Sequence, residues 1–76
     1  MATAGLIVIG DEILSGKVVD TNTPFLIGEL RELGTRLGEI AVIADQRAGI
    51  AETVARFAAR YDAVFTSGGV GPTHDD

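Results

Sequence analysis

The residues best suited to chemistry in this 76-residue chain lie in a glycine-rich stretch that runs from Thr66 to Asp76. The stretch follows a short apolar run, residues 63–65, which has the pattern of a buried strand. Gly68, Gly69 and Gly71 place three glycines within four residues. Such a backbone can adopt positive φ angles, and its amides can close around an anion. The spacing therefore predicts a loop that binds phosphate at the carboxyl end of a strand.

The residues after this loop are typical of a helix N-terminus. Pro72 suits the first helical position, and Thr73 and Asp76 have the T-x-x-D spacing of a capping box. The start of a helix carries a partial positive charge, and His74, Asp75 and Asp76 add groups able to hold a metal ion or a proton. This arrangement suits phosphate together with a divalent metal ion. The alternatives are a glycine turn with no ligand and a histidine that only faces solvent.

Three further carboxylates follow expected strands. Asp11 and Glu12 come after the apolar run 6–9, so the end of that strand would bring them to the same edge as the glycine loop. They could hydrogen-bond the ring of a ligand or could only occupy a solvated turn. Asp45 follows the apolar run 40–43 and would lie beside the glycine loop if the second strand neighbours the third. It could equally be the N-cap of the helix that follows.

Two familiar phosphate-binding motifs are incomplete here. Residues 10–17 resemble a Walker A loop, but five residues instead of four separate Gly10 from Gly16, and Val18 replaces the expected Ser or Thr. The pair Gly69 and Gly71 begins a G-x-G-x-x-G pattern, but His74 occupies the position of the third glycine. Neither a kinase-type nor a dinucleotide-binding fingerprint is predicted.

The elements that must position these groups follow a β-α-β-α-β order. The expected strands are residues 6–9, 37–44 with 40–43 as the core, and 63–65, and residues 13–22 form a loop or short turn. The first helix should begin at a Thr23 cap and end at Gly34. The second helix should end at Asp62, and its apolar face comprises Ile50, Val54, Phe57, Ala58 and Tyr61. Right-handed crossovers then predict an α/β fold, a three-layer α/β/α sandwich with a mainly parallel sheet.

Composition narrows the possible partners. The formal net charge is −5, from 6 basic and 11 acidic residues, without a basic run, so nucleic acid and anionic membranes are not expected partners. The absence of cysteine excludes disulfides and thiolate metal sites. No signal peptide or transmembrane stretch is evident, which favours a cytoplasmic location. So short a chain is near the lower limit for an independent core, and exposed strand edges favour a homo-oligomer.

The stretch from Ser67 to Asp76 resembles the ligand loop of the molybdopterin-binding domain family, whose members include molybdopterin adenylyltransferases. It is most similar to the subgroup of competence/damage-inducible protein A, a domain also fused in eukaryotic FAD synthases. Residues 10–16 with 20–22, and residues 43–45, agree with the same subgroup. The resemblance runs from about Leu6 to Asp76 and covers about the first half of the family domain. Residues 1–76 are therefore expected to form one incomplete domain.

The resemblance also implies roles for individual residues. Asp45 and Asp76 match aspartates that are implicated in catalysis with Mg²⁺, and both are predicted metal ligands. Adenylyltransferases of the family tend to carry arginine where this chain has Asp75. This replacement of a positive by a negative group favours phosphate binding through a metal ion. Asp75 could also orient a water molecule. The predicted catalytic residues are Asp45, Asp75 and Asp76. The predicted ligand-binding residues are Asp11, Glu12, Ser67, Gly68, Gly69, Gly71 and Thr73.

Three functions remain open at this point. The preferred one is a molybdopterin-binding-type domain that binds a phosphorylated pterin or nucleotide with Mg²⁺, linked to molybdenum cofactor biosynthesis. The resemblance implies two activities for it, nucleotidyl transfer to the pterin phosphate and hydrolysis of a pyrophosphate such as ADP-ribose. Both need in-line attack at phosphorus with a metal ion stabilising the charge, so the loop does not separate them. Besides transfer and hydrolysis, the third possibility is a binding or regulatory module without turnover.

Overall fold

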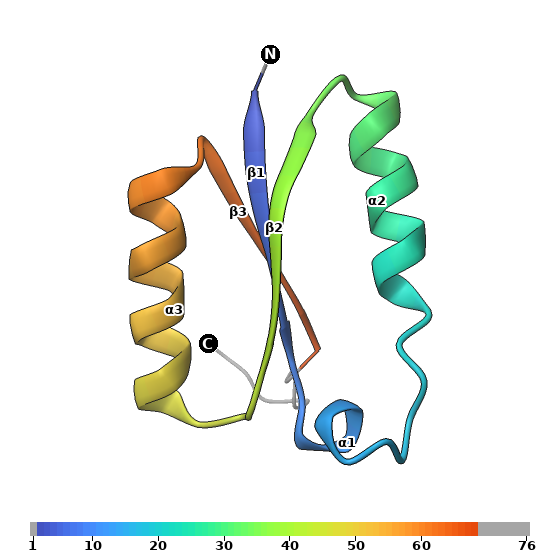
Figure 1. Cartoon of the computed structure of the whole chain (residues 1–76), viewed down its shortest axis with the longest axis vertical. Coiled ribbons are helices and arrows are strands. Elements are labelled where there is room, and N and C mark those ends of the chain that lie inside the picture. The colour runs from blue at the N-terminus through green and yellow to red at the C-terminus, as the bar shows by residue number, and fades with distance from the viewer. Residues whose placement is uncertain (1, 69–76) are drawn as a thin grey trace.

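A computed structural model describes residues 2–68 of the chain. It contains three strands and three helices, and two of the helices follow one another between the first two strands, as Figure 1 shows. Their bounds are β1 Thr3–Ile9, α1 Asp11–Leu14, α2 Asn22–Glu32, β2 Arg36–Ile43, α3 Arg47–Arg60 and β3 Ala63–Gly68. The expected β-α-β-α-β order is confirmed, with the addition of α1, a single helical turn where a loop or short turn was expected.

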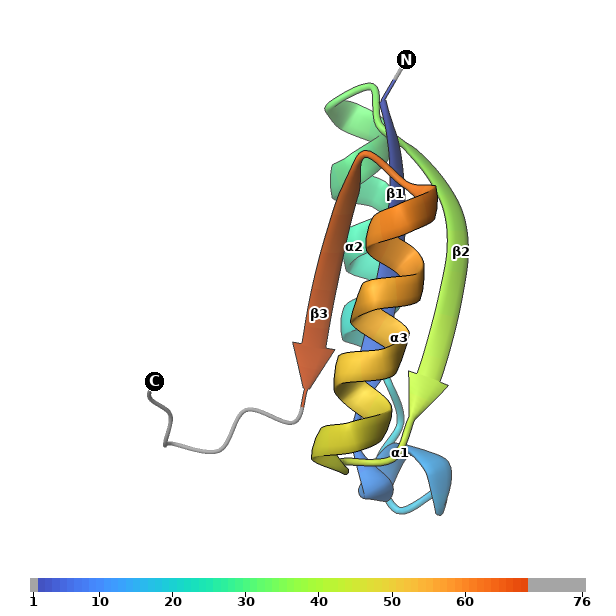
Figure 2. The same cartoon turned by 90° about the vertical axis from the view of Figure 1, so that its left-hand side faces the viewer.

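The three strands form one parallel sheet in the order β2-β1-β3. Figure 2 shows β1 between its two neighbours, with α3 in front of the sheet and α2 behind it. The two helices lie on opposite faces because the chain leaves β1 toward one side to form β2 and then crosses back over β1 to form β3. Right-handed crossovers in opposite directions must cover opposite faces. The predicted three-layer α/β/α arrangement with a parallel sheet is confirmed.

The core is centred on β1, whose residues from Ala4 to Ile9 are all buried. A strand with helices on both faces needs apolar side chains in both directions, which explains its unbroken apolar sequence. Ile7 and Ile9 point to the α3 face, where they form a cluster with the fully buried Phe57 of α3. Around this cluster lie partly buried apolar residues of β2, α3 and β3: Ala41, Ile43, Ile50, Val54, Tyr61 and Val64.

The ends of α2 show one wrong and one correct prediction. The helix begins at Asn22, and the side chain that binds its free amides belongs to Asp20, which accepts hydrogen bonds from the amides of Asn22 and Thr23, each at 3.1 Å. Thr23 is therefore not the cap, and its hydroxyl also donates to Asp20. These bonds lower the pKa of the Asp20 carboxyl, the Thr23 hydroxyl contributing most.

Gly34 ends α2 as predicted. It has a φ of 76°, which glycine adopts without strain. Its amide donates to the carbonyl of Arg31 at 3.0 Å, and the amide of Thr35 donates to the carbonyl of Leu30 at 2.9 Å. This is the hydrogen-bond pattern of a Schellman motif, which satisfies carbonyls that the helix leaves free.

The amino-terminal ends of β1 and β2 are covered by the last turn of α3. The ring of Tyr61 lies over Gly38, where an added Cβ would be 2.6 Å from the ring, and over Gly5. The Tyr61 hydroxyl donates to the Glu39 carboxylate at 2.8 Å, and Arg60 donates to the same carboxylate at 2.9 Å. We call Glu39, Arg56, Arg60 and Tyr61 the amino-end cluster, in which Arg56 is 3.5 Å from Glu39.

The cytoplasmic location and the homo-oligomer that the sequence favours stay predictions. Within residues 2–68, no helix is long and apolar enough to cross a membrane. β2 and β3 are the outer strands of the sheet that these residues form, and self-association through such edges remains a prediction.

Candidate functional site

The carboxyl ends of the three strands meet at one edge of the sheet. Ile9, the last residue of β1, pairs with Ile43 of β2 on one side and with Gly68 of β3 on the other. The residues that follow β1 and β2 therefore start from the same level, which Figure 1 shows at the end of the sheet nearest α1. Asp11 and Glu12 therefore lie at the same edge as Gly68, whereas the rest of the glycine loop, with which they were expected to share this edge, lies outside the described residues.

The strand order changes the predicted position of Asp45 relative to the glycine loop. Asp45 was expected beside the glycine loop on condition that the second strand neighbours the third, but β1 lies between β2 and β3. The residues that follow β1 are thus the ones flanked by the other two strand ends. The carboxyl ends of the strands are also where open α/β sheets bind ligands. Asp45, which follows β2, lies to one side of the end of β1.

Asp11 joins the ends of β1 and β2. The sheet ladder continues one step beyond the strands, because the Gly10 amide donates to the carbonyl of Ile43 at 3.0 Å. Asp11 then begins α1, and its Oδ1 atom accepts a hydrogen bond from the amide of Asp45 at 3.2 Å. Both aspartates are exposed. The structure therefore brings together two predicted site residues that are 34 positions apart in the chain.

Asp45 is not a helix cap. The N-cap of α3 is Gln46, so the structural alternative for Asp45 is wrong. The residue lines a hollow of about 450 Å³ together with Arg47, Ile50 and Ala51 at the start of α3. A carboxylate, a guanidinium and an apolar wall thus share one depression. Among the residues that the structure describes, Arg47 forms no salt bridge.

Arg47 is a residue that the sequence did not single out. Like Lys17 and Arg36, it could approach a phosphate, but nothing in the spacing of these residues shows which of them does. The useful signal is its position four residues after Ile43, the last residue of β2, because side chains that follow such a strand reach the ligand edge. Arg36, in contrast, begins β2 at the opposite edge.

Gly68 ends β3 in a conformation that needs glycine. Its φ is 79°, and a Cβ at this position would overlap the carbonyl oxygen of Ile9. A side chain here would be strained by the backbone and blocked by the neighbouring strand. Thr66, Ser67 and Gly68 were expected in the loop, which is wrong, because all three belong to β3. Ser67 pairs with Val8 and is half-buried.

Glu12 follows Asp11 in α1 and is exposed. Its carbonyl accepts hydrogen bonds from the amides of Lys17 and Val18, at 3.0 and 3.2 Å, which turns the chain after α1. Its carboxylate remains at the carboxyl edge, with Oε2 3.0 Å from where a Cβ of Gly10 would be. The other predicted site residues, Gly69, Gly71, Thr73, Asp75 and Asp76, lie outside the described residues.

The donor chemistry at this edge fits magnesium. Residues 2–68 contain no group of three or more His, Asp or Glu side chains placed to hold a metal ion. Mg²⁺ does not need such a cage, since it is usually bound by one or two carboxylates and by the phosphates of the substrate, with several waters retained. The exposed Asp45 carboxylate is a ligand of the required kind, and Asp76 is the predicted second one.

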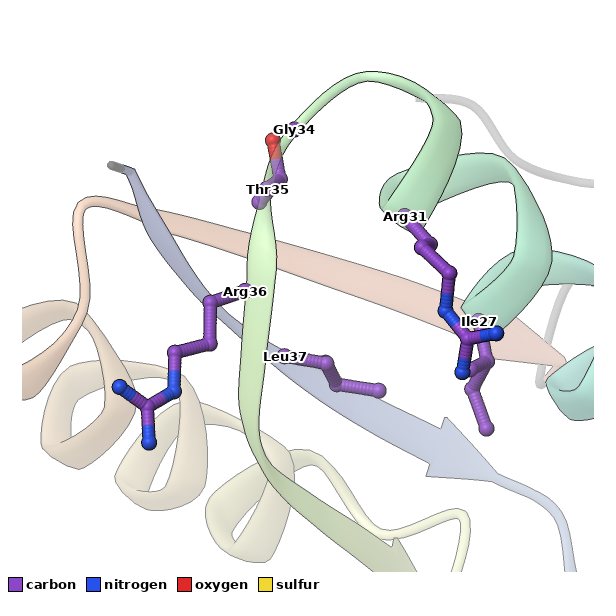
Figure 3. A pocket seen from close by; sticks show the side chains of 6 residues that line it. All are labelled: Ile27, Arg31, Gly34, Thr35, Arg36 and Leu37. Atoms are coloured by element: carbon purple, nitrogen blue, oxygen red, sulfur yellow. The ribbon is translucent and has the colours of Figure 1, made fainter.

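A second hollow lies at the opposite edge of the sheet. Figure 3 shows it between the end of α2 and the start of β2, where it is lined by Ile27, Arg31, Gly34, Thr35, Arg36 and Leu37. The side chains of Arg31 and Arg36 lie on different sides of β2 in that view and do not converge. The adjacent helix end is a C-terminus, whose partial negative charge disfavours anions. No predicted site residue lines this hollow.

Comparison with known proteins identifies the family. The family model described as a probable molybdopterin binding domain matches residues 5–76. A probable FAD synthase of Caenorhabditis briggsae is 51% identical over 74 residues, which are 97% of this chain and 14% of that protein. A CinA-like protein of Mycobacterium leprae is 48% identical over 77 residues, covering 99% of this chain and 18% of that protein.

A solved structure supports the same assignment. The crystal structure of the protein CinA from Thermoplasma acidophilum matches with a TM-score of 0.87 and 33% sequence identity. The match covers 95% of this chain and 43% of that one, so the chain spans less than half of the solved relative and between 14% and 18% of the two curated relatives. Because the family model covers nearly all of its residues, the chain belongs to the probable molybdopterin binding domain family, among CinA-like relatives, as the sequence resemblance predicted.

Proposed function

We propose that this domain binds a phosphorylated pterin or nucleotide, with Mg²⁺, at the carboxyl edge of the sheet. The observation that supports this most directly is the hollow in which Asp45 lies beside Arg47 and an apolar wall. Asp11 is hydrogen-bonded to the Asp45 amide at the same edge. The ligand class follows from the chemistry of these groups. The Arg47 guanidinium suits an anion, the Asp45 carboxylate suits a metal ion, and the apolar wall suits a flat ring.

The side chains of this edge divide the recognition between them. The guanidinium of Arg47 pairs with a phosphate group, for which its planar set of donors is well suited. Ile50 and Ala51 form the apolar surface against which a pterin or base ring packs. Asp45 provides a carboxylate oxygen for the metal ion, with Asp76 as the second carboxylate. The backbone amides of the glycine loop hold the phosphate in the same proposal.

Two reactions are compatible with this proposal. Bound Mg²⁺ supplies charge stabilisation at the phosphate oxygens during in-line displacement. In nucleotidyl transfer the pterin phosphate attacks, whereas in pyrophosphate hydrolysis of an ADP-ribose-like nucleotide a water molecule attacks. Asp75 favours hydrolysis, since a carboxylate there can orient water and an arginine cannot accept its proton. The name of the FAD synthase relatives also agrees with a nucleotide as ligand.

A second candidate function is a binding or regulatory module without turnover. It is favoured by the proportion of the relatives that this chain covers, which is 14% of the probable FAD synthase. The remainder of such a protein offers ample sequence for an active site elsewhere. In this case the carboxyl edge binds the same ligands but does not convert them.

Calorimetry tests the proposal on the 76-residue protein. ADP-ribose, AMP and a molybdopterin precursor are titrated with and without Mg²⁺, while AMP formed from ADP-ribose is followed by chromatography. We expect Mg²⁺-dependent binding that weakens about tenfold or more in Asp45→Asn and in Asp76→Asn. Glu32→Gln is the matched control, because it changes an exposed carboxylate at the far end of α2.

The outcomes separate the candidates. AMP formation supports the hydrolase, and tight binding without turnover supports the module. If a folded sample binds none of the three compounds, or if both aspartate variants bind as well as the wild type, the proposed site is refuted.

A further inference from the structure

The turn that carries Asp45 has an amide that the backbone of the described residues does not satisfy. β2 ends at Ile43 and α3 begins at Arg47, so a short connection joins them. The amide of Gln46 donates to the carbonyl of Ala44 at 2.9 Å, a hydrogen bond that closes a three-residue γ-turn around Asp45. The amide of Asp45 itself points to a side chain, the Oδ1 atom of Asp11 at 3.2 Å.

We propose that Asp11 is a positioning residue, which holds the Asp45 turn in place through this hydrogen bond and does not itself contact the ligand. The inference rests on the proposed function for its consequence in binding, but the structural role is independent of any ligand. Asp11 suits the role because its own backbone is anchored: the preceding Gly10 amide is bonded to Ile43 at 3.0 Å. A carboxylate is also a stronger acceptor for an amide than a neutral oxygen.

The alternative is that the Asp11 carboxylate meets a ligand ring or the metal ion directly. The two roles depend on different properties of the side chain. Positioning needs only an acceptor oxygen at the right place, which asparagine retains. Metal binding needs the negative charge, and acceptance of two ring donors needs both oxygens; asparagine lacks the charge and has only one oxygen. Asp11→Asn and Asp11→Ala therefore behave differently under positioning and alike under direct contact.

Amide hydrogen exchange of the ligand-free protein tests the structural role. In the wild type we expect the Asp45 amide to exchange about tenfold more slowly than an open-chain amide, since it is hydrogen-bonded. Asp11→Asn should keep this protection and Asp11→Ala should remove it. A wild-type Asp45 amide that exchanges at the open rate overturns the inference, whether or not a variant folds. So does unchanged protection in Asp11→Ala.

Calorimetry with ADP-ribose and Mg²⁺ tests the consequence. Residues that orient a metal ligand typically change affinity by about ten- to a hundredfold when removed, so we expect about tenfold weaker binding in Asp11→Ala and a change below about threefold in Asp11→Asn. Glu32→Ala is the control, with no expected change. Equal losses in the Asn and Ala variants would assign Asp11 to direct contact and refute positioning. If the wild type binds no ligand, the proposed function fails, while hydrogen exchange still decides the role of Asp11.

Discussion

At the amino-terminal end of the sheet the charged side chains bind one another, whereas at the carboxyl end they face solvent with few partners. The amino-end cluster joins two arginines and a tyrosine to the Glu39 carboxylate. Close by, the Thr3 amide donates to Asp62 at 2.9 Å, and its hydroxyl donates to the same carboxylate. At the other end, the Asp45 and Glu12 carboxylates accept no side-chain hydrogen bond from the described residues.

The contrast separates stability from function within one small sheet. Aromatic packing accompanies the paired charges at the amino end, where the rings of Phe57 and Tyr61 meet edge to face with their centroids 5.7 Å apart. Such packing contributes to stability beyond the area that it buries. Unpaired groups at the carboxyl end contribute little to the fold and remain available to a ligand. The comparison predicts that substitutions at the amino end change the unfolding free energy, whereas substitutions at the carboxyl end change ligand binding.

The largest effect on stability should come from Gly5→Ala. A methyl group at Gly5 would overlap the ring of Phe57, which is fully buried and cannot move aside, and would be 2.9 Å from the ring of Tyr61. Overpacking of this kind costs about 2 kcal/mol of unfolding free energy, which urea denaturation measures. The control is Gly28→Ala in α2, where no atom lies within 4 Å of the added methyl. It should raise stability by about 0.5–1 kcal/mol through helix propensity. Equal effects of the two changes would mean that the amino end is not tightly packed.

A smaller loss of stability is expected for Tyr61→Phe, which keeps the ring and removes only the hydrogen bond to Glu39. That bond is the main cause that lowers the pKa of the Glu39 carboxyl from its ordinary value of 4.5, with Arg60 and Arg56 adding to it. A lowered pKa in the folded state means that the unfolded state binds more protons. The resulting stabilisation is present above about pH 4.5 and is lost as the pH falls through the folded pKa.

The pH dependence sharpens this prediction. Unfolding free energy of the wild type should fall as the pH is lowered below about 4.5, and the part due to Glu39 should be smaller in Tyr61→Phe. The bond also raises the pKa of the Tyr61 phenol above 10.0. The stabilisation from this bond is therefore present below pH 10 and is lost as the pH rises through the raised pKa of the phenol. Parallel acid profiles for wild type and variant, measured by urea denaturation, would contradict the assigned role of the hydroxyl.

The smallest effects on stability are expected at the carboxyl end. Asp45→Asn and Arg47→Gln remove charges that have no salt-bridge partner among the described residues. Each should change the unfolding free energy by less than about 0.5 kcal/mol, as is usual for exposed positions. The Asp45 amide is retained in both proteins, so its bond to Asp11 is kept. A loss above about 1 kcal/mol in either variant would show that this end is built for stability as well, and the contrast between the two ends would fail.

Several parts of this architecture could be predicted from local pattern. The apolar runs identified all three strands, and the periodicity of Ile50, Val54 and Phe57 identified α3. Gly34 ended α2 as expected because a positive φ favours glycine regardless of what surrounds it. Boundaries were less predictable. The first free amides of α2 donate to Asp20, and Thr23 is not the cap. Several polar residues in a row can each reach the same amides, and only the path of the chain selects one.

The order of strands and helices along the chain, the family and the aspartates worth testing could be predicted from residue type and short spacing. The folded structure was needed to show that β1 lies between β2 and β3, that Asp45 is therefore separated from the end of β3, and that Asp11 binds the Asp45 amide. It also placed Arg47 in the same hollow as Asp45. Strand order arises from how the crossovers pack on the sheet. The contact between residues 34 positions apart follows from that packing and not from any local pattern.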